Sequence, residues 1–473
     1  MVFSSLEFLC VFLPIVFILY TVIPTIKAKN ALLILASLLF YAYGETLYAF
    51  LMIASSILNY LCALWTAKSR GGQKKAAIIT AVIVNLGILG IFKYTGFIVE
   101  SVNSLTGLSL HVPEIALPIG ISFFTFQALS YVIDVYRGTV EVQKNYFKVL
   151  LYICFFPQLI AGPIVKYRDI NEQISARQQS PEKVAQGLRR FICGLAKKVI
   201  IANSMGQVAD AIFNSDMSLI SQAGSWIGII AYIFQIYYDF SGYSDMAIGL
   251  GLMFGFEFKE NFNYPYGATS IKDFWRKWHI SLSTWFKEYL YIPLGGNRKG
   301  KARAALNRII VFFCTGLWHG ANWTFVLWGL WHGLFLLIEE YVPPMKKMPK
   351  ILGHIYTMLV VTLGFVLFRA DTISFGLRYI GKMFSFAHSG SSSLFAEQLT
   401  PWFIVTLISA IIGCAPIKPL SDKLRSAFAG NGKMSGKYKA ASTALYIISF
   451  IGLCWCILRL SPGNYNPFIY FRF

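Results

Sequence analysis

The sequence predicts an all-α polytopic membrane protein. Of its 473 residues, 56% are hydrophobic and only 14% are charged, and the mean hydropathy is +0.57. Soluble domains of ordinary composition do not reach these values. Apolar runs also recur along the whole chain, separated by short basic or Gly/Ser-rich linkers. We therefore expect a single membrane domain over residues 1–473, with about eleven transmembrane helices plus re-entrant and interfacial helices.

The formal charge is strongly positive, at +20 from 42 Lys and Arg against 22 Asp and Glu. The positive residues lie between apolar runs, a distribution that the positive-inside rule and contact with anionic membrane lipids explain. No nucleic-acid motif accompanies the charge, so we expect no nucleic-acid partner. The eight cysteines form no CxxC pair and lie mostly within apolar runs, which favours small hydrophobic packing residues and no metal site.

Four spans are predicted in the first quarter of the chain, at residues 3–24, 31–43, 47–66 and 76–98. The first lacks a basic start and a cleavage site, which indicates an uncleaved span rather than a signal peptide. Lys27 and Lys29 follow it, which places the N-terminus outside and their own loop in the cytoplasm. The second and third spans form a hairpin bent at Gly44–Glu45, which returns the chain to a second basic loop at 68–75.

The middle of the chain carries polar residues and prolines inside apolar runs, in the segments 117–138, 155–170, 191–213 and 222–256. The first segment suits a helix that faces the protein interior. The second has two prolines and a glycine, and we interpret it as re-entrant, because irregular backbone at membrane depth needs protein or water around it. The fourth contains Asp239 and Asp245, which are functional candidates as intramembrane carboxylates. The alternative, that each pairs with a nearby Arg or Lys to hold the fold, stays open.

The catalytic candidates lie in residues 272–333, where a basic half meets an apolar half. The apolar run from Ile309 to Ile338 has 30 residues, about 45 Å of helix against a hydrocarbon core of about 30 Å. A single straight span therefore fits poorly, and we expect a break at Gly316–Gly320. His319 lies inside that break, and a histidine at membrane depth requires a polar cavity or a partner.

Two further histidines accompany His319. His279 lies 40 residues earlier, among tryptophans that indicate an interfacial segment, and beside Arg276 and Lys277. His332 follows His319 by 13 positions, about 220° around an ideal helix, so the two cannot face one cavity unless the helix breaks. A membrane histidine is more often a packing residue than a catalyst, and the pattern alone does not choose between them. Three more spans follow, near 351–369, 401–420 and 441–460, joined by linkers at 385–398 and 426–439.

Several longer motifs are recognisable as a set: LPIGISFFTFQ, QLIAGPIVKY, YYDFSGYSDMAIG, FWRKWHISLSTWFKEYLYIPLGGNR, GLWHGANWTFVLWG and NYNPFIYFRF. With these motifs the chain resembles the membrane-bound O-acyltransferase family, and within it the bacterial alginate O-acetyltransferase-like branch. The resemblance places the family's essential histidine on His319 and its second characteristic position on His279. It implies a ring of tilted helices around a central tunnel, in a multi-pass protein of the bacterial cytoplasmic (inner) membrane.

The resemblance also implies the substrates. An acyl thioester, acetyl-CoA or an acyl-carrier protein, would meet an acceptor from the outer side near His319, with no permanently bound cofactor. An exported acyltransferase- or esterase-like protein and a polysaccharide would be the outer partners. His319 would act as general base, and His279 would orient the donor or stabilise the oxyanion. The other expected substrate-binding residues are Arg276, Lys277, Trp278, Trp318, Asn322, Tyr238, Asp239 and Asp245.

The leading hypothesis is therefore acetyl transfer for O-acetylation of a cell-surface or secreted polysaccharide. One alternative is D-alanyl transfer to teichoic acid from a carrier protein, which would use the same tunnel. A transporter or flippase is a different class, since intramembrane Asp and His also mark ion pathways. No inverted repeat is evident in the sequence, which argues against the common transporter plans.

Overall fold

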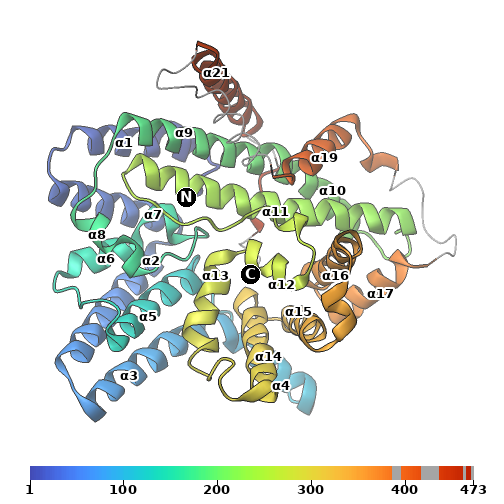
Figure 1. The fold of residues 1–473 in the computed structure, drawn as a ribbon, viewed down its shortest axis with the longest axis horizontal. Coiled ribbons are helices and arrows are strands. Elements are labelled where there is room, and N and C mark those ends of the chain that lie inside the picture. The colour runs from blue at the N-terminus through green and yellow to red at the C-terminus, as the bar shows by residue number, and fades with distance from the viewer. Residues whose placement is uncertain (386–395, 417–435, 462–464, 470–473) are drawn as a thin grey trace.

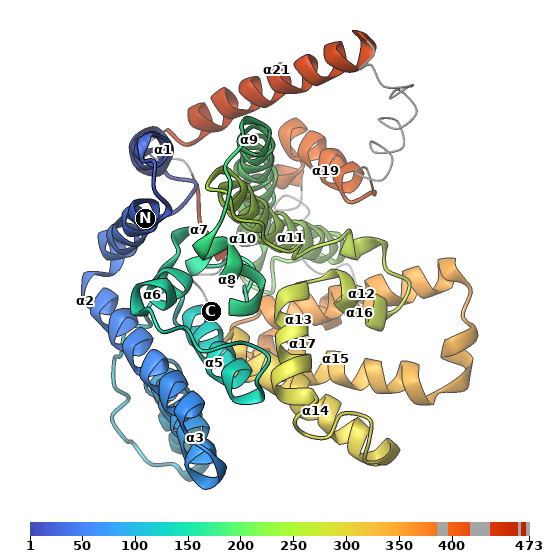
Figure 2. The same cartoon turned by 60° about the vertical axis from the view of Figure 1, so that its left-hand side comes forward.

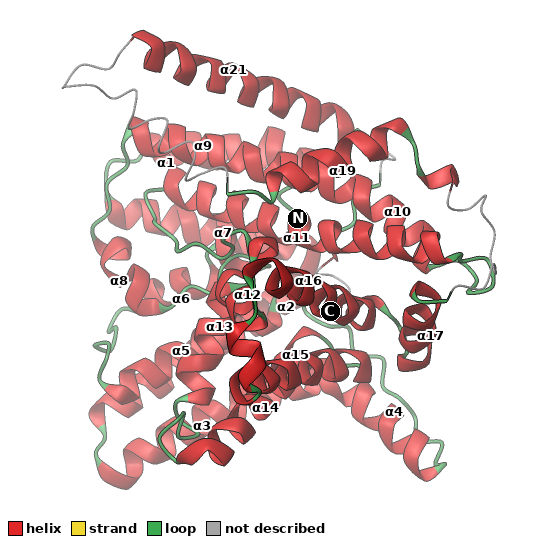
Figure 3. Cartoon of the chain, turned by 45° about the vertical axis from the view of Figure 1, so that its right-hand side comes forward, coloured by secondary structure: helices red, strands yellow, loops and turns green. Residues whose placement is uncertain are grey.

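The computed structural model describes residues 1–385, 396–416, 436–461 and 465–469. Within these ranges the chain is helical and contains no strand (Figure 3). The all-α expectation is confirmed over the described residues.

The N-terminal helices begin at one side of the molecule, on the left of Figure 1, and the last of them, α4, lies nearer the middle of that view. They are η1 (Phe8–Phe12), α1 (Leu13–Val22), α2 (Ile26–Lys68), α3 (Gly71–Leu89), η2 (Gly90–Tyr94) and α4 (Thr95–Thr106). The long α2 is interrupted at Glu45, whose backbone is non-helical at φ −145° and ψ 56°. The bend predicted at Gly44–Glu45 is therefore confirmed. Each arm of the bent helix is held by a hydrogen bond to another part of the chain. In the arm before Glu45, the Asn30 side-chain amide donates to the Ile174 carbonyl at 2.9 Å. In the arm after Glu45, the Tyr60 hydroxyl donates to the Lys144 carbonyl at 2.7 Å.

The next group is α5 (Ile121–Arg137), α6 (Tyr146–Cys154), α7 (Phe156–Leu159) and α8 (Tyr167–Ser175). Helix α5 is buried along nearly its whole length, as the polar residues among its aromatics predicted. The irregular segment after α6 is enclosed as well, because every residue from 155 to 167 is buried. A side chain at Gly162 would come within 2.6 Å of the Gln158 backbone, so this turn needs glycine. The irregular backbone is surrounded by protein, as the re-entrant interpretation requires.

The centre of the molecule is α11 (Gln222–Met253), which is buried over most of its 32 residues and packs along α9 (Pro181–Ala196) (Figure 1). Glycines set this close approach. A side chain at Gly187 or at Gly194 would come within 2.5 Å of a carbonyl oxygen on α11. Helix α9 continues through η3 (Lys197–Ala202) into α10 (Asn203–Phe213).

The region that carries the candidate chemistry folds as short helices followed by a helical hairpin. The short helices are η4 (Pro265–Gly267), α12 (Ile271–Lys277), α13 (Ile280–Phe286) and η5 (Lys287–Tyr291), and the hairpin is α14 (Gly300–His319) and α15 (Trp323–Tyr341). The predicted break is confirmed, because α14 ends at His319 and Gly320 is extended. The hairpin is tightly packed, since a side chain at Gly329 would overlap the Phe312 carbonyl oxygen.

The C-terminal part adds η6 (Pro343–Lys347), α16 (Lys350–Arg369), α17 (Ile373–Met383), α19 (Pro401–Gly413) and α21 (Gly436–Arg459). Helix α21 lies along one side of the molecule, opposite the end that holds α3 (Figure 2). The two predicted linkers, 385–398 and 426–439, lie in part outside the described residues. Residues 465–469 return to the interior, where the Ile469 amide donates to Asp239 at 2.9 Å.

Among the described residues, three helical stretches are long and apolar enough to cross a membrane: Ile26–Lys68, Gly71–Thr106 and Lys350–Arg369. Shorter apolar helices are Phe8–Val22, Pro401–Gly413 and Thr443–Arg459. The count of about eleven spans stays a prediction.

Candidate active site

His279 and His319 lie close together although 40 residues separate them in the sequence. Their ring centroids are 6.4 Å apart. His319 is the last residue of α14, and His279 immediately precedes α13. Both side chains are buried, with 5% of His319 and none of His279 exposed. The helix break therefore brings together two of the three histidines singled out in the sequence.

Loop residues hold His279 in an unusual backbone conformation. Its φ of 44° and ψ of 54° are left-handed, a region that residues other than glycine rarely adopt. The Nδ1 atom lies 3.3 Å from Oδ1 of Asn261, and Nε2 is buried with no hydrogen-bond partner in the described part of the chain. Strained backbone of this kind clusters at functional sites.

Aromatic side chains surround His319 and leave little room for water beside it. Its ring centroid lies 5.0 Å from those of Trp318 and Trp328 and 5.2 Å from that of Phe368. A cavity of about 10 Å³, measured as the volume open to the centre of a water molecule, lies against the ring. That volume holds about one water molecule. The site is therefore dry and aromatic around the imidazole.

A buried lysine, which the sequence reasoning missed, supports the end of α14. Lys93 on η2 is only 9% exposed, and its Nζ donates to the Trp318 carbonyl at 2.6 Å. The adjacent Tyr94 donates to the Leu317 carbonyl at 2.7 Å. Carbonyls in the last turn of a helix have no partner within the helix, so these two contacts fix the turn that carries His319. The sequence did contain a signal for this role, because Lys93 is a lone lysine inside the predicted span 76–98, and a charged residue at membrane depth is a functional candidate.

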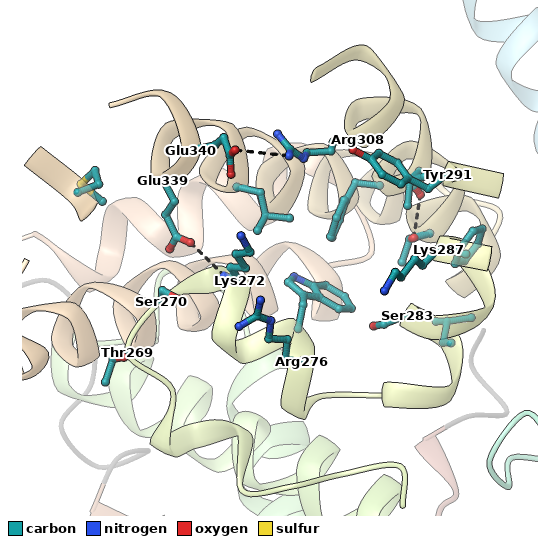
Figure 4. Close-up of a pocket in the computed structure, with 18 of the residues that line it drawn as sticks. Thr269, Ser270, Lys272, Arg276, Ser283, Lys287, Tyr291, Arg308, Glu339 and Glu340 are labelled. Carbon is teal, nitrogen blue, oxygen red and sulfur yellow. Dashed lines mark hydrogen bonds and ion pairs between the residues drawn. The ribbon is translucent and has the colours of Figure 1, made fainter. Parts of the chain in front are cut away.

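A large basic cavity opens on one side of the histidine pair, between the segment α12–η5 and the hairpin α14–α15 (Figure 4). Its volume is about 780 Å³. Its charged lining residues are Lys272, Arg276, Lys287, Arg308, Glu339 and Glu340. Glu339 accepts from the backbone amides of Ile271 and Lys272, at 2.5 and 3.0 Å, and so caps α12. We call this space the basic cavity.

A second cavity, of about 380 Å³, lies beyond the other end of α14, and we call it the Lys93 cavity. Its lining includes Lys93, Gly320, Phe368 and Arg369. Along α14 the basic cavity reaches Thr315 and the Lys93 cavity begins at Gly320. His319 therefore lies along α14 between the residues that line the two cavities, although its own side chain lines only the small cavity.

Comparison with known proteins identifies the chain. The family model described as the membrane-bound O-acyltransferase family matches residues 142–374, a range that contains His279, His319 and His332. The probable alginate O-acetylase of Azotobacter vinelandii is 39% identical over the full length of both chains. The chain belongs to the membrane-bound O-acyltransferase family. It is accordingly an O-acyltransferase and an integral membrane protein.

Two other relatives differ in their acceptors. The peptidoglycan O-acetyltransferase of Helicobacter pylori is 38% identical over 81% of this chain and 80% of that protein. The teichoic acid D-alanyltransferase of Bacillus subtilis is 27% identical over 53% of this chain and 67% of that protein.

In this O-acyltransferase, two of the expected substrate-binding residues, Trp278 and Trp318, lie beside the histidine pair, and a third, Asn322, lies in the lining of the Lys93 cavity. Trp278 lines the small cavity against His319, and the Trp318 ring lies 5.7 Å from that of His279. Asn322 lines the Lys93 cavity and also caps α15, where its Oδ1 accepts from the Thr324 amide at 3.0 Å.

Arg276 and Lys277 have different surroundings. The Arg276 side chain lines the basic cavity and has no ion-pair partner among the described residues (Figure 4). Lys277 instead pairs with Asp273 at 2.8 Å, one helical turn away, and lines neither large cavity. The structure therefore places only Arg276 where it can meet a substrate in the basic cavity.

Tyr238, Asp239 and Asp245 lie outside the lining of the three cavities described above. Tyr238 donates to the Ala410 carbonyl on α19 at 2.6 Å. Asp239 pairs with buried Lys198 at 2.7 Å and so holds the C-terminal segment in place. Asp245 pairs with Arg190 at 2.8 Å and with Lys197 at 2.7 Å. The two carboxylates have the ion-pair partners that the structural alternative required, and a role in substrate binding stays a prediction for all three.

His332 is enclosed by aromatic rings on the other side of Trp328. It is fully buried, stacks parallel to Phe274 at 6.2 Å and lies 5.2 Å from Trp328. Neither of its ring nitrogens has a hydrogen-bond partner in the described ranges. His332 has the surroundings of a packing residue.

Proposed function

We propose that this enzyme takes an acetyl group from acetyl-CoA in the cytoplasm and passes it across the membrane for O-acetylation of a cell-surface or secreted polysaccharide. One observation carries the proposal: a buried histidine pair lies between two cavities, and one of these is basic. Such an arrangement lets a donor and an acceptor approach the same imidazole from opposite sides. An exported partner protein would receive or relay the group on the outer side.

The basic cavity suits the donor. Four cationic side chains and two carboxylates line it, and one carboxylate, Glu339, is engaged in capping a helix. Coenzyme A carries several phosphate charges, and arginine binds phosphate in bidentate fashion. We expect these basic segments to face the cytoplasm by the positive-inside rule, on the side where acetyl-CoA is made available.

The relatives favour acetyl as the acyl group. The two that are named for O-acetylation are 38–39% identical over four fifths or more of this chain. The D-alanyltransferase is more distant, at 27% identity over 53%. D-Alanyl transfer from a carrier protein remains the second candidate, because its acidic carrier would also fit a basic entrance.

Acetyl transfer from a thioester to a hydroxyl requires one proton to move from the hydroxyl oxygen to the leaving sulfur. Neutral His319 takes the proton of the acceptor hydroxyl as the oxygen attacks the thioester carbonyl carbon. When the tetrahedral intermediate collapses, the carbon–sulfur bond breaks and the thiolate takes the proton back from the imidazolium. A thioester is already activated, so positioning in a water-poor site and this single proton transfer are sufficient.

Acetyl transfer by purified protein in liposomes tests the proposal. Acetyl-CoA labelled in the acetyl group is supplied on one side, and label in an O-acetyl ester of an added polysaccharide or partner protein is measured. We expect transfer when acetyl-CoA has access to the basic cavity, and none from free labelled acetate. Transfer from a D-alanyl carrier but not from acetyl-CoA would contradict the acetyl assignment. An absence of ester formation with either donor would favour a transporter.

A further inference from the structure

The loop at residues 261–263 pairs with the segment that carries His279. The Ile280 amide donates to the Asn261 carbonyl at 2.9 Å, and the Asn263 amide donates to the Lys277 carbonyl at 2.9 Å. These bonds flank the left-handed residue on both sides. They show which part of the chain stabilises a backbone conformation that is unfavourable for a histidine by itself.

The Asn261 side chain is completely buried, and its orientation is determined by its neighbours. Its Oδ1 accepts from the backbone amide of Ser281 at 3.0 Å, and a backbone N–H can only donate. The Ser281 hydroxyl donates to the same oxygen at 2.8 Å. The opposite end, Nδ2, donates to the Ser244 hydroxyl at 3.2 Å. The oxygen of the amide therefore faces His279.

This orientation selects one tautomer of His279. Its Nδ1 lies 3.3 Å from the same Oδ1, which has lone pairs and no hydrogen. The Ser281 hydroxyl oxygen also lies 3.5 Å from Nδ1, but its hydrogen goes to Oδ1 of Asn261 at the shorter distance of 2.8 Å. Nδ1 therefore carries the hydrogen when the ring is neutral, and Nε2 carries a lone pair. Because Nε2 is buried with no protein partner in the described ranges, no described donor group competes for that lone pair.

We infer that Asn261 is a positioning residue that holds neutral His279 with its hydrogen on Nδ1, so that Nε2 acts on the reaction as an acceptor and not as an oxyanion donor. The inference rests on the proposed function and assigns a role within the same site. It replaces the oxyanion role expected for His279, since stabilising an oxyanion requires an N–H.

The acceptor nitrogen has a defined use in the transfer step. His319 gains a positive charge when it takes the hydroxyl proton, and its ring lies 6.4 Å from that of His279. The lone pair of Nε2 is the negative end of the imidazole dipole, and electrostatic effects are strong where water is excluded. His279 thus stabilises the His319 imidazolium until the leaving thiolate takes the proton back.

Three variants test the inference in the liposome assay. Asn261→Leu has a similar volume but no acceptor, so both tautomers of His279 become accessible. We expect kcat to fall about 10-fold or more, with the ~10⁴-fold loss known for a catalytic imidazole held in the wrong tautomer as an upper bound. The KM for acetyl-CoA should not change. Ser244→Ala, the matched control, removes only the bond at the far end of the Asn261 amide and should retain activity.

Asn261→Asp separates positioning from general structural support. A carboxylate preserves the acceptor for Nδ1–H and for Ser281, so activity should exceed that of Asn261→Leu. Its negative charge favours protonated His279, so the acidic limb of the pH–kcat profile should move to higher pH. The groups packed against the His279 ring are Phe240 of α11, Phe262 and Asn261 of the loop, and Trp318 and His319 of α14. Of these only His319 titrates.

The outcomes are distinguishable. An Asn261→Leu variant with wild-type kcat, or an Asn261→Asp variant whose pH profile matches that of the wild type, would overturn the role of Asn261. Losses from Asn261→Leu and His279→Ala that multiply fully in the double variant would also overturn it, because residues acting through one another are not additive. If wild-type protein transfers no acetyl group at all, the proposed function itself fails.

Discussion

At the scale of single residues, the site combines groups that a membrane interior normally excludes. His279, His319 and Lys93 are all buried, and Lys93 donates to a carbonyl and a hydroxyl, not to a carboxylate. Two other buried cations have acidic partners, as Lys198 has in Asp239 and Arg369 has in Asp210. Buried Arg177 resembles Lys93, because its hydrogen bonds also go to carbonyls and uncharged side chains. Intramembrane ionisable groups are expensive, and those retained beside a cavity are the strongest functional candidates.

Arg276 and Lys277 provide a matched pair for testing donor binding. Arg276→Gln should raise the KM for acetyl-CoA about 3- to 10-fold with little change in kcat, because a partly exposed charge on a phosphate contributes modestly. The effect should shrink at high salt. Lys277→Gln removes a charge that Asp273 already neutralises, so its KM should stay at the wild-type value. Steady-state kinetics on purified protein measure both, and equal KM values in the two variants would refute donor binding by Arg276.

At the scale of elements, the hairpin of α14 and α15 determines where His319 lies. Glycines on both helices allow the close approach, and side chains at Gly316 or Gly329 would overlap backbone atoms of the partner helix. The helix then ends at His319 because Gly320 adopts an extended backbone. A hairpin with a wider separation between its helices would move the His319 imidazole away from Gly320 and the other residues that line the Lys93 cavity.

The glycine contacts can be tested with one methyl group. Gly329→Ala should separate the two helices and lower the free energy of unfolding by about 1–3 kcal/mol. It should lower kcat and leave the KM for acetyl-CoA nearly unchanged. Gly87→Ala is the control, because nothing lies within 4 Å of a Cβ at that position. Thermal unfolding in detergent and acyl transfer report on the two effects. Equal Tm and activity in both variants would show that the hairpin tolerates separation.

The sequence predicted individual elements well where the signal is local. The bend at Glu45, the break after His319 and the enclosed segment at 155–167 follow from glycines, prolines and polar residues within apolar runs. The approach of His279 to His319 is different, because it depends on packing between segments that are distant in the sequence. The roles of Asn261 and Lys93 follow from the same packing. Neither residue belongs to a sequence motif from which its contact partner could be predicted.

At the scale of the whole molecule, the two ends of the site have different neighbours. The N-terminal amine lies near the bend of α2, as a Cβ at Gly44 would be 3.5 Å from the Met1 nitrogen. The Tyr48 hydroxyl, just past that bend, donates to the Ala116 carbonyl at 2.9 Å, beside residues that line the Lys93 cavity. The N-terminus and the Lys93 cavity therefore share one end of the molecule.

This arrangement predicts the orientation in the membrane. If the basic segments at 27–29, 68–75 and 298–303, which include helix ends, face the cytoplasm, the N-terminus and the Lys93 cavity open to the outside. Single cysteines at Lys74→Cys and Glu114→Cys, in a background whose native cysteines are replaced, test it with an impermeant thiol reagent. We expect labelling of intact cells at position 114 and labelling at position 74 only after lysis. The reverse pattern would refute the orientation.

The central claim is that His319 carries the chemistry and that His332, one tryptophan away, does not. Acetyl transfer from labelled acetyl-CoA should be measured for His319→Ala and His332→Phe, at equal protein and with matched elution from a sizing column. We expect His319→Ala to lose about 10²- to 10⁴-fold in kcat, the usual contribution of a general base. His332→Phe should retain most activity, because a phenyl ring preserves the stacking on Phe274. Full activity in His319→Ala, or equal losses in both variants, would contradict the assignment.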